Sequence, residues 1–528
     1  MSRFLPVVLF AAAALLTFQA PAHAASASRP PNIVLFLVDD LGWRDLGVYG
    51  SSFYETPQLD RFARANVRFT DAYAPCHVCS PTRASIMTGK YPARLQLTDW
   101  LPGRRDFPFQ KLNNAKPRPH LPLEETTLAE ALKEHGYATG HFGKWHLGED
   151  PSGPLQHGFD VQVPRWNKCC PNKGYHAPFG LEGLTDAPGD YLTDRLTDEA
   201  LKYIDENRSR PFFLYLSHFA PHDPIQGRAD LVAKYQAKLQ QRAAADRAPF
   251  ILEGNPDAKN APTRTQLDAA LKEDAYRGYQ VLPNQTVKIK QHQDNVQFAA
   301  MVESLDESFG RVIAKLEALG LSENTIVIFT SDNGGMSAAN FGRPDRIVAP
   351  TALDAAFATS NLPLRGAKGW LYEGGIRVPM IIKWPGRSAR GIVSSVPAIS
   401  TDLYPTILEM IGAPARPSQH LDGVSLAGVV RGEKPPARDA LYWHFPHYSN
   451  HGMQSPGAAI RQGDFKLLEY FENNTVQLFN LREDLGEQHD LAREQPGRTQ
   501  QMTALLHQWR RSVSAAMMDP NPAYKGQE

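Results

Sequence analysis

The chain has 528 residues, with 56 lysines and arginines against 56 aspartates and glutamates. This balance gives no reason to expect a nucleic acid as partner or stable insertion into a membrane, and we predict neither. The length exceeds what one hydrophobic core usually holds, which predicts two domains or one large domain with an appendage.

The first 24 residues are typical of a cleaved signal peptide. Arg3 precedes the apolar run FLPVVLFAAAALLTF, and AHA at residues 22–24 matches a small-x-small cleavage site. A transmembrane anchor is the alternative, but the run is shorter than the roughly 20 residues that span a bilayer. We therefore expect an exported protein, periplasmic or secreted, that loses residues 1–24.

Buried strands and amphipathic helices alternate along most of the chain. The apolar runs PNIVLFLVDD (31–40), RPFFLYLSHF (210–219) and NTIVIF (324–329) predict parallel strands. Residues 127–136 and 296–320 predict helices that end at Gly136 and Gly320, each followed by a strand. The pattern predicts an α/β fold, a large mixed, mostly parallel sheet with helices on both faces.

Two later segments depart from this pattern. Residues 227–295 have little strand signal and resemble an insertion with one or two helices. From residue 438, short strands separated by turns precede a helix, which predicts a smaller C-terminal α+β domain with an antiparallel sheet. The expected units are therefore 25–437, containing the insertion, and 438–528.

Acidic side chains follow two of the predicted strands. Asp39 and Asp40 end the first, and Asp332 and Asn333 follow the strand at 324–329. Such residues are often simply turn formers. Because ligands bind at the carboxyl ends of parallel strands, however, these four could converge on a hard cation such as Ca²⁺ or Mg²⁺.

Basic side chains lie near the same strand ends. Lys144 and His146 are two residues apart, so on an extended segment both side chains would face the same way. His222 occurs in APHDP, Lys368 in LRGAKGW, and Arg83 four residues after Cys79. Such a group is typical of a clamp for a tetrahedral oxyanion, sulfate or phosphate.

The four cysteines are too few for a disulfide scaffold. Cys76 and Cys79 have the spacing of a redox pair, but the surrounding sequence matches a thioredoxin-type context poorly. Cys169 and Cys170 are neighbours, and a bond between neighbours is uncommon. From the residues alone, Cys79 stays open as half of a disulfide, half of a redox pair or a metal ligand.

The motif Cys79-Ser80-Pro81-Thr82-Arg83 resembles the C-x-P-x-R of the sulfatases, the Cys-type formylglycine-dependent arylsulfatases of the alkaline-phosphatase-like superfamily. Five further blocks, in the family's order, are similar to its other motifs: NIVLFLVDDLGWRDLGVYG, GYATGHFGKWHLG, LYLSHFAPHDPIQ, IVIFTSDNGG and LRGAKGWLYEGGIRVPMIIKWPG. The resemblance covers about residues 31–491. Thr82 stands where serine is commoner.

The resemblance implies that a maturation enzyme oxidises Cys79 to Cα-formylglycine. One hydroxyl of the aldehyde hydrate would attack sulfur, and the other would then expel sulfate. It also implies one Ca²⁺ held by Asp39, Asp40, Asp332 and Asn333, with residue 79 as fifth ligand.

The remaining roles are likewise implied by the resemblance. Arg83 would hold the hydrate and the metal shell, and His146 would take the proton of the second hydroxyl. Lys144 and Lys368 would hold sulfate oxygens. His222, with Lys368, would protonate the leaving oxygen.

The expected activity is sulfate ester hydrolysis on sulfated saccharides or aryl sulfates. The alternatives are a phosphatase or phosphonate monoester hydrolase on the same fold, and a non-catalytic protein that binds sulfated glycans. Candidates for recognising the rest of the substrate are Trp100 and three histidines of the C-terminal unit, His444, His447 and His451. An equally good alternative is that these four side chains only pack at the boundary between the two domains.

Overall fold

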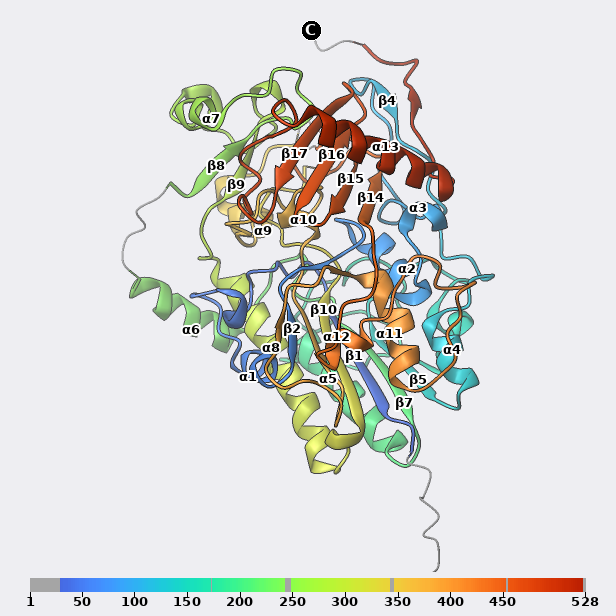
Figure 1. Ribbon diagram of the computed structural model, residues 1–528. Helices are drawn as coiled ribbons and strands as arrows, with labels where there is room; N and C mark the ends of the chain where they lie inside the picture. Colours follow the sequence, from blue (N-terminus) through green and yellow to red (C-terminus); the bar gives the residue numbers. More distant parts are fainter. Residues whose placement is uncertain (1–28, 172, 243–247, 342–345, 453, 526–528) are drawn as a thin grey trace, which may run out of the picture.

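The computed structural model describes residues 29–171, 173–242, 248–341, 346–452 and 454–525. The predicted signal peptide, residues 1–24, lies outside them. Figure 1 shows a central sheet flanked by helices, with a second, antiparallel sheet above it.

The central sheet has eight strands in the order β12-β2-β11-β10-β1-β7-β5-β6. β11 runs antiparallel to its neighbours β10 and β2, and the other neighbouring pairs are parallel. The predicted mixed, mostly parallel sheet is therefore confirmed. The strands span Asn32–Val38 (β1), Val67–Phe69 (β2), Ala138–Gly143 (β5), Val161–Val163 (β6), Phe212–Ser217 (β7), Thr325–Ser331 (β10), Met380–Lys383 (β11) and Val393–Ser394 (β12).

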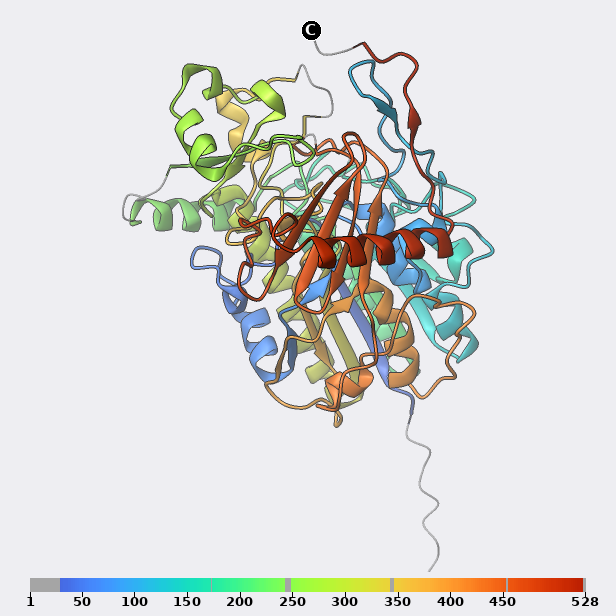
Figure 2. The same ribbon diagram turned by 45° about the horizontal axis from the view of Figure 1, so that its top comes forward.

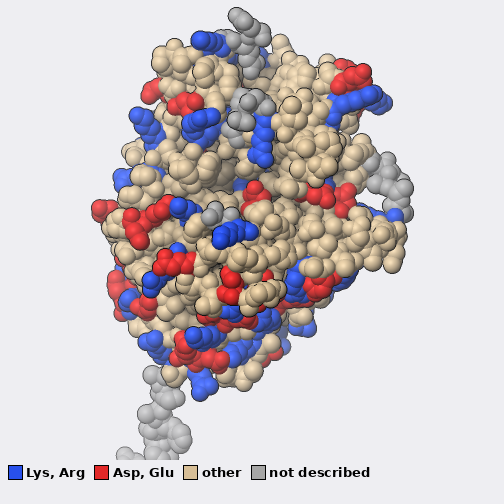
Figure 3. Space-filling view, turned by 180° about the vertical axis from the view of Figure 1, so that it is seen from behind, with Lys and Arg blue, Asp and Glu red and all other residues tan. Residues whose placement is uncertain are grey.

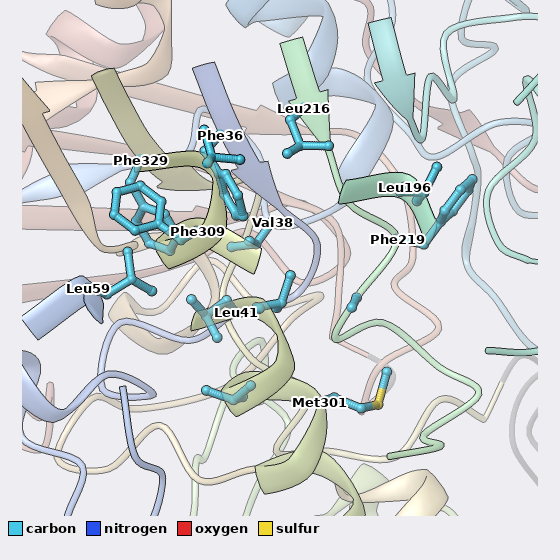
Figure 4. Close-up of a cluster of buried hydrophobic side chains, with 14 of the residues drawn as sticks. Phe36, Val38, Leu41, Leu59, Leu196, Leu216, Phe219, Met301, Phe309 and Phe329 are labelled. Atoms are coloured by element: carbon cyan, nitrogen blue, oxygen red, sulfur yellow. The ribbon is translucent and has the colours of Figure 1, made fainter. Parts of the chain in front are cut away.

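Both faces of this sheet are buried, because successive side chains of a strand point to opposite faces. In β1, Val34, Phe36 and Val38 join one hydrophobic cluster, and Ile33, Leu35 and Leu37 join a second. This is why β1 is apolar at every position from Ile33 to Val38. Figure 4 shows part of the first cluster, where Phe36 and Phe329 of the sheet meet Phe309 of α8.

Helices complete each cluster. The first receives side chains from α1 (Pro57–Ala65), α5 (Leu192–Asn207), α6 (Ala229–Gln240) and α8 (Val296–Ala318). The second receives them from α2 (Cys79–Thr88), α3 (Pro92–Leu95), α4 (Leu128–Glu134), α11 (Leu403–Met410) and α12 (Ala427–Val430). The helices thus cover opposite faces, as expected for this fold class.

A four-stranded antiparallel sheet lies towards the C-terminus, in the order β14-β15-β16-β17. Its strands span Leu441–Phe445, Gly457–Gln462, Phe465–Tyr470 and Thr475–Asn480, and α13 (Pro496–Ser512) lies across them (Figure 2). A third hydrophobic cluster joins this sheet to Trp370 and Tyr372. The second sheet is therefore packed against the segment that carries Lys368 and leads into α10 (Glu373–Ile376).

The segment 227–295 contains more strand than expected. Helices α6 and α7 (Arg264–Ala270) are present, but β8 (Phe250–Glu253) and β9 (Val287–Lys290) also pair antiparallel. Each strand has only four residues, and the partners are far apart in the sequence, so neither produces a clear local pattern. Shorter pairs join β3 (Ala72–Tyr73) to β13 (Ala398–Ile399) and β4 (Leu112–Asn113) to β18 (Asp519–Pro520), and α9 spans Leu353–Ala356.

The surface carries mixed charge. On the face shown in Figure 3, basic and acidic side chains are interspersed over short distances. Within the described residues, no helix is both long and apolar enough to cross a bilayer.

Candidate active site

The sheet register brings the predicted acidic residues together. Val38 pairs with Ser331, so Asp39 and Asp332 leave neighbouring strands at the same edge. The backbone N–H of Asp332 donates to Val38 O at 3.2 Å. Asp40 has a positive φ of 65°, and its N–H donates to Oδ1 of Asp332 at 3.1 Å.

Helix α2 begins at Cys79, and all ten of its residues are buried. Arg83 lies one turn later, on the same side of the helix as Cys79. Its guanidinium contacts Asp332 Oδ2 at 2.7 and 2.9 Å and lies 3.6 Å from Asp39 Oδ1. The arginine therefore ties the helix that carries Cys79 to the acidic ends of β1 and β10.

The segment after β5 supplies Lys144 and His146, but not in the extended form that we expected. Gly143 has a φ of 107°, and a Cβ there would lie 1.9 Å from Ser217 O, so this turn requires glycine. His146 is also left-handed, with a φ of 57°. The segment is therefore not extended through His146, because the chain turns at the sheet edge.

Two lysines each meet one acidic residue. Lys144 Nζ lies 2.5 Å from Asp39 Oδ2, and both side chains are fully buried. Lys368 Nζ lies 2.7 Å from Asp40 Oδ2, which also places the loop under the C-terminal sheet at this edge. Burial alone would raise the pKa of Asp39, but the charge of Lys144 and other nearby cations lowers it below the usual range.

His222 completes the basic side of the cluster. Its Nε2 lies 2.9 Å from Lys368 Nζ and 3.6 Å from Asp40 Oδ2, while Nδ1 lies 2.6 Å from Asp223 Oδ1. Burial alone would lower the pKa of His222, but the Asp40 and Asp223 carboxylates raise it above its usual range. These two carboxylates thus favour a protonated imidazole, against the opposing charge of Lys368.

His146 has the opposite character. Its Nε2 lies 2.7 Å from the Leu101 carbonyl oxygen, which can only accept, so Nε2 carries the proton. Nδ1 is buried and has no hydrogen-bond partner. Burial, and then the charge of Lys144, lower the pKa of His146 well below its usual range. The ring is therefore neutral, with a free lone pair on Nδ1.

The acidic residues fit a cation. Oδ1 of Asp39 and Oδ1 of Asn333 are buried without a hydrogen-bond partner, although Nδ2 of Asn333 donates to Asp40 Oδ1 at 2.8 Å. Donor atoms of Asp39, Asp40, Cys79 and His222 lie within 4.8 Å of one another. Burial, and then the charge of Asp39, raise the pKa of Asp332 to about 6. Oxygen ligands of this kind suit Ca²⁺ or Mg²⁺.

Sequence reasoning missed several neighbours of this cluster. Ser217, at the end of β7, accepts a hydrogen bond from Arg83 at 2.6 Å, and Asp223 pairs with His222. Their positions at or just after a buried strand were the available signal. Cys169 and Cys170 form a disulfide beside His222, whereas Cys76 and Cys79 are free, so neither forms a disulfide.

The four substrate-recognition candidates are placed differently. Trp100 packs against Cys76, Val78 and Phe445, next to the start of α2. His444 Nε2 lies 2.7 Å from Ala516 O, and His447 Nε2 lies 2.8 Å from Thr98 Oγ1. His451 is different, because its Cβ lies 2.6 Å from where a Cβ on Gly369 would be, next to Lys368.

Family comparisons agree with this arrangement. Residues 31–413 match the Sulfatase family, and residues 367–514 match the family described as N-sulphoglucosamine sulphohydrolase, C-terminal. A sulfatase of Formosa agariphila is 30% identical over 94% of this chain and 90% of its own. Arylsulfatase A of Homo sapiens is 32% identical over 83% of this chain and 75% of its own.

A solved structure shares the fold. The crystal structure of Ps i-CgsB has a TM-score of 0.67 and 27% identity, covering 91% of this chain and 93% of its own. The match to the Sulfatase family spans the strand-end acids, the start of α2 and the basic residues described above. The chain therefore belongs to the sulfatase family and is a sulfuric ester hydrolase.

Proposed function

We propose that the chain hydrolyses sulfate esters through Cys79 after its conversion to Cα-formylglycine by a maturation enzyme. The observation that carries this proposal is the position of Cys79. It lies at the first residue of buried α2, within 4.8 Å of donor atoms of Asp39, Asp40 and His222. A nucleophile there would meet acidic oxygens on one side and a proton donor on the other.

Asp39, Asp40, Asp332 and Asn333 would hold one Ca²⁺, with residue 79 as a further ligand. The two orphaned buried oxygens, on Asp39 and Asn333, support this ligand set. When bound, Ca²⁺ would neutralise sulfate oxygens and lower the pKa of the hydrate hydroxyl. Arg83 would keep Asp332 and the start of α2 in register through its paired contacts.

Lys144 and Lys368 would hold the sulfate. Each ammonium group already faces the centre of the cluster, where it contacts Asp39 or Asp40. Charge-assisted hydrogen bonds from two such donors are strong in a buried site. They would fix the sulfur with one hydroxyl of the residue 79 hydrate on one side and the leaving oxygen on the other.

The two histidines would move protons in opposite directions. His222 would donate from Nε2 to the leaving oxygen, as its paired carboxylates favour the charged ring. His146 would accept the proton of the second hydroxyl at Nδ1, as its partnered Nε2 leaves that nitrogen free. The second hydroxyl would then expel sulfate and restore the aldehyde.

The substrate we propose is a sulfated saccharide or an aryl sulfate outside the cytoplasm. A relative from Canis lupus familiaris, 31% identical over 80% of this chain, is an N-acetylgalactosamine-6-sulfatase. Ps i-CgsB has also been solved in complex with k-i-k-neocarrahexaose. The predicted signal peptide supports export.

Peptide mass spectrometry of the Cys79 region tests this proposal. Conversion of the thiol to an aldehyde lowers the peptide mass by ~18 Da. We expect that shift in active protein, and we expect Cys79→Ala to lose turnover of 4-nitrophenyl sulfate while keeping its thermal unfolding midpoint. Cys76→Ala is the matched control, since Cys76 is a free, buried cysteine three residues away. Fully active protein with only a thiol at residue 79 contradicts the proposal.

A further inference from the structure

The Cys169–Cys170 disulfide lies directly against His222. Cys170 Sγ is 3.6 Å from Nδ1 of the ring, and Cys169 Sγ is 3.8 Å from Nε2. One sulfur therefore lies beside each ring nitrogen, and the S–S bond runs alongside the imidazole. The disulfide is partly exposed, whereas His222 is buried.

The disulfide also reaches the sulfate-binding side of the cluster. Cys169 Sγ lies 3.8 Å from Lys144 Nζ. Within the segment that carries it, Trp166 Nε1 donates to Cys170 O at 2.8 Å, and the His146 N–H ties the segment to the active site by donating to Asn167 O at 3.1 Å. A movement of this segment would therefore displace its contacts with both His222 and Lys144, which lie on opposite sides of the proposed sulfate position.

Each ring nitrogen of His222 has one polar neighbour: Asp223 Oδ1 lies 2.6 Å from Nδ1, and Lys368 Nζ lies 2.9 Å from Nε2. The Asp223 carboxylate accepts from Nδ1, but Lys368 can only donate and also contacts Asp40, so it cannot hold Nε2 when the ring is protonated. A bonded pair of sulfurs presents one rigid, apolar surface, because the bond fixes the two atoms relative to each other. Two separate thiols would each rotate freely and could form hydrogen bonds of their own with the ring.

We propose that the Cys169–Cys170 disulfide is a positioning element that fixes the His222 ring for proton donation to the leaving oxygen. The inference rests on the role proposed above for His222. The two cysteines would have this function only when they are oxidised to the disulfide. Reduction by dithiothreitol would convert the S–S bond to two thiols, with two electrons and two protons supplied as the reagent closes to its own cyclic disulfide.

A leaving-group series separates positioning from a structural role. Protonation matters for a poor leaving group such as phenolate and little for 4-nitrophenolate. The Cys169→Ser/Cys170→Ser variant should therefore lose about tenfold or more in kcat/KM on phenyl sulfate, as expected when a catalytic group is misplaced. On 4-nitrophenyl sulfate it should lose less than about threefold. Equal losses on both substrates would overturn the inference.

A double-mutant cycle tests whether the disulfide acts through His222. Adding the two cysteine substitutions to His222→Ala should cost little more on phenyl sulfate than His222→Ala alone, because coupled residues are not additive. Additive losses would overturn the inference. Cys76→Ser is the matched control for removal of a cysteine, and it should leave the ratio of the two rates unchanged.

Reduction of folded wild-type protein gives the same comparison if the double variant does not fold. Treatment with dithiothreitol should lower turnover of phenyl sulfate selectively, and removal of the reagent in air should restore it. Reaction of the reagent with the aldehyde at residue 79 would lower turnover of phenyl sulfate and 4-nitrophenyl sulfate alike, so the ratio of the two rates controls for it. Alkylation is used to show that both thiols are free after reduction. If the ratio of the two rates is then unchanged, the inference is overturned. Absence of any sulfatase turnover by the wild-type protein would instead count against the proposed function.

Discussion

Single buried atoms decide what the cluster can hold. Asp39 and Asn333 each bury an oxygen without a hydrogen-bond partner, and leaving such an atom unsatisfied is costly. Lys144, Lys368 and Arg83 already neutralise much of the carboxylate charge. A cation that binds these oxygens would remove the remaining cost, which supports the proposed metal site.

Asn333→Ala should therefore weaken Ca²⁺ binding by about tenfold or more, since the number of oxygen ligands sets the affinity. Turnover should fall with the metal content and recover partly at high Ca²⁺. The measurement is metal content by mass spectrometry, together with the shift of the unfolding midpoint during a Ca²⁺ titration.

Asn333→Asp is the matched control, because it keeps an oxygen at this position. It should retain more Ca²⁺ than the alanine variant. If Asn333→Ala binds Ca²⁺ as tightly as the wild type, or if the protein carries stoichiometric zinc and no calcium or magnesium, the proposed ligand set is wrong.

At the scale of elements, helix α8 holds the start of helix α1. The N-cap residue of α1, Thr56, makes no side-chain capping bond. Instead Asp306 of α8 accepts from Leu59 N at 2.7 Å and from Gln58 N at 3.0 Å. A carboxylate from a neighbouring helix thus satisfies two N–H groups that the helix start leaves free.

Asp306→Ala should lower the free energy of unfolding by about 2–4 kcal/mol, because it leaves two buried or partly buried donors unsatisfied. Chemical denaturation measures this change. The neighbouring Glu307→Ala is the control, since its partly exposed ion pair with Arg228 should contribute about 0–1 kcal/mol. Similar losses for both variants would mean that Asp306 does not hold the helix.

The same carboxyl group predicts a pH dependence. Burial raises the pKa of Asp306 to about 7, from a usual value of 3.8. The folded state therefore holds this proton more tightly, so its contribution to stability is full below pH ~4 and is lost as the pH rises through ~7. The stability advantage of the wild type over Asp306→Asn should narrow across this range, and a constant or widening difference would contradict the assignment.

The elements with a strong local pattern could be predicted from the sequence. β1, β10 and α8 each form where an apolar run or a 3.6-residue period occurs, and Gly320 follows α8 with a φ of 67°. β8 and β9 could not, because their pairing joins two short segments across a long intervening stretch.

Part of the candidate site could likewise be predicted from the sequence, and part could not. The acids at the ends of β1 and β10 could be placed together, since register follows from parallel pairing. The left-handed turn at His146 and the packing of the Cys169–Cys170 pair against His222 could not be predicted, because each involves contacts between segments far apart in the chain. Asp223 is adjacent to His222, but their pairing depends on side-chain orientation, which the local sequence pattern does not specify. The boundary between the two expected domains stays a prediction.

Across the whole molecule, the second sheet is tied to the active-site loop by buried charges. Lys466 of β16 lies 3.0 Å from Glu373 of α10 and 2.9 Å from Glu487, and all three side chains are fully buried. Breaking such a pair is costly because it leaves a buried charge uncompensated. The C-terminal sheet is thus held in a fixed position beside the loop that carries Lys368.

Because of this arrangement, His451 is the best candidate for binding the part of the substrate that carries the sulfate. It lies against Gly369, and burial, then the charge of Lys368, lower its pKa well below the usual range, so the ring is neutral. A neutral imidazole can donate to and accept from sugar hydroxyls. His444 and His447 already bind Ala516 and Thr98 and are less suited to this task.

His451→Ala should therefore lower kcat/KM on the natural sulfated saccharide by about tenfold or more, because a contact to the leaving group is lost. On 4-nitrophenyl sulfate, which offers little for this side chain to touch, the loss should stay below about threefold. The measurement is steady-state kinetics on both substrates, once a screen of sulfated sugars has found a saccharide. His444→Ala is the matched control from the same segment, and it should affect both substrates alike through stability. Equal losses for His451→Ala would make this residue structural or catalytic, and no loss on either substrate would move recognition to Trp100 or to the segment 227–295.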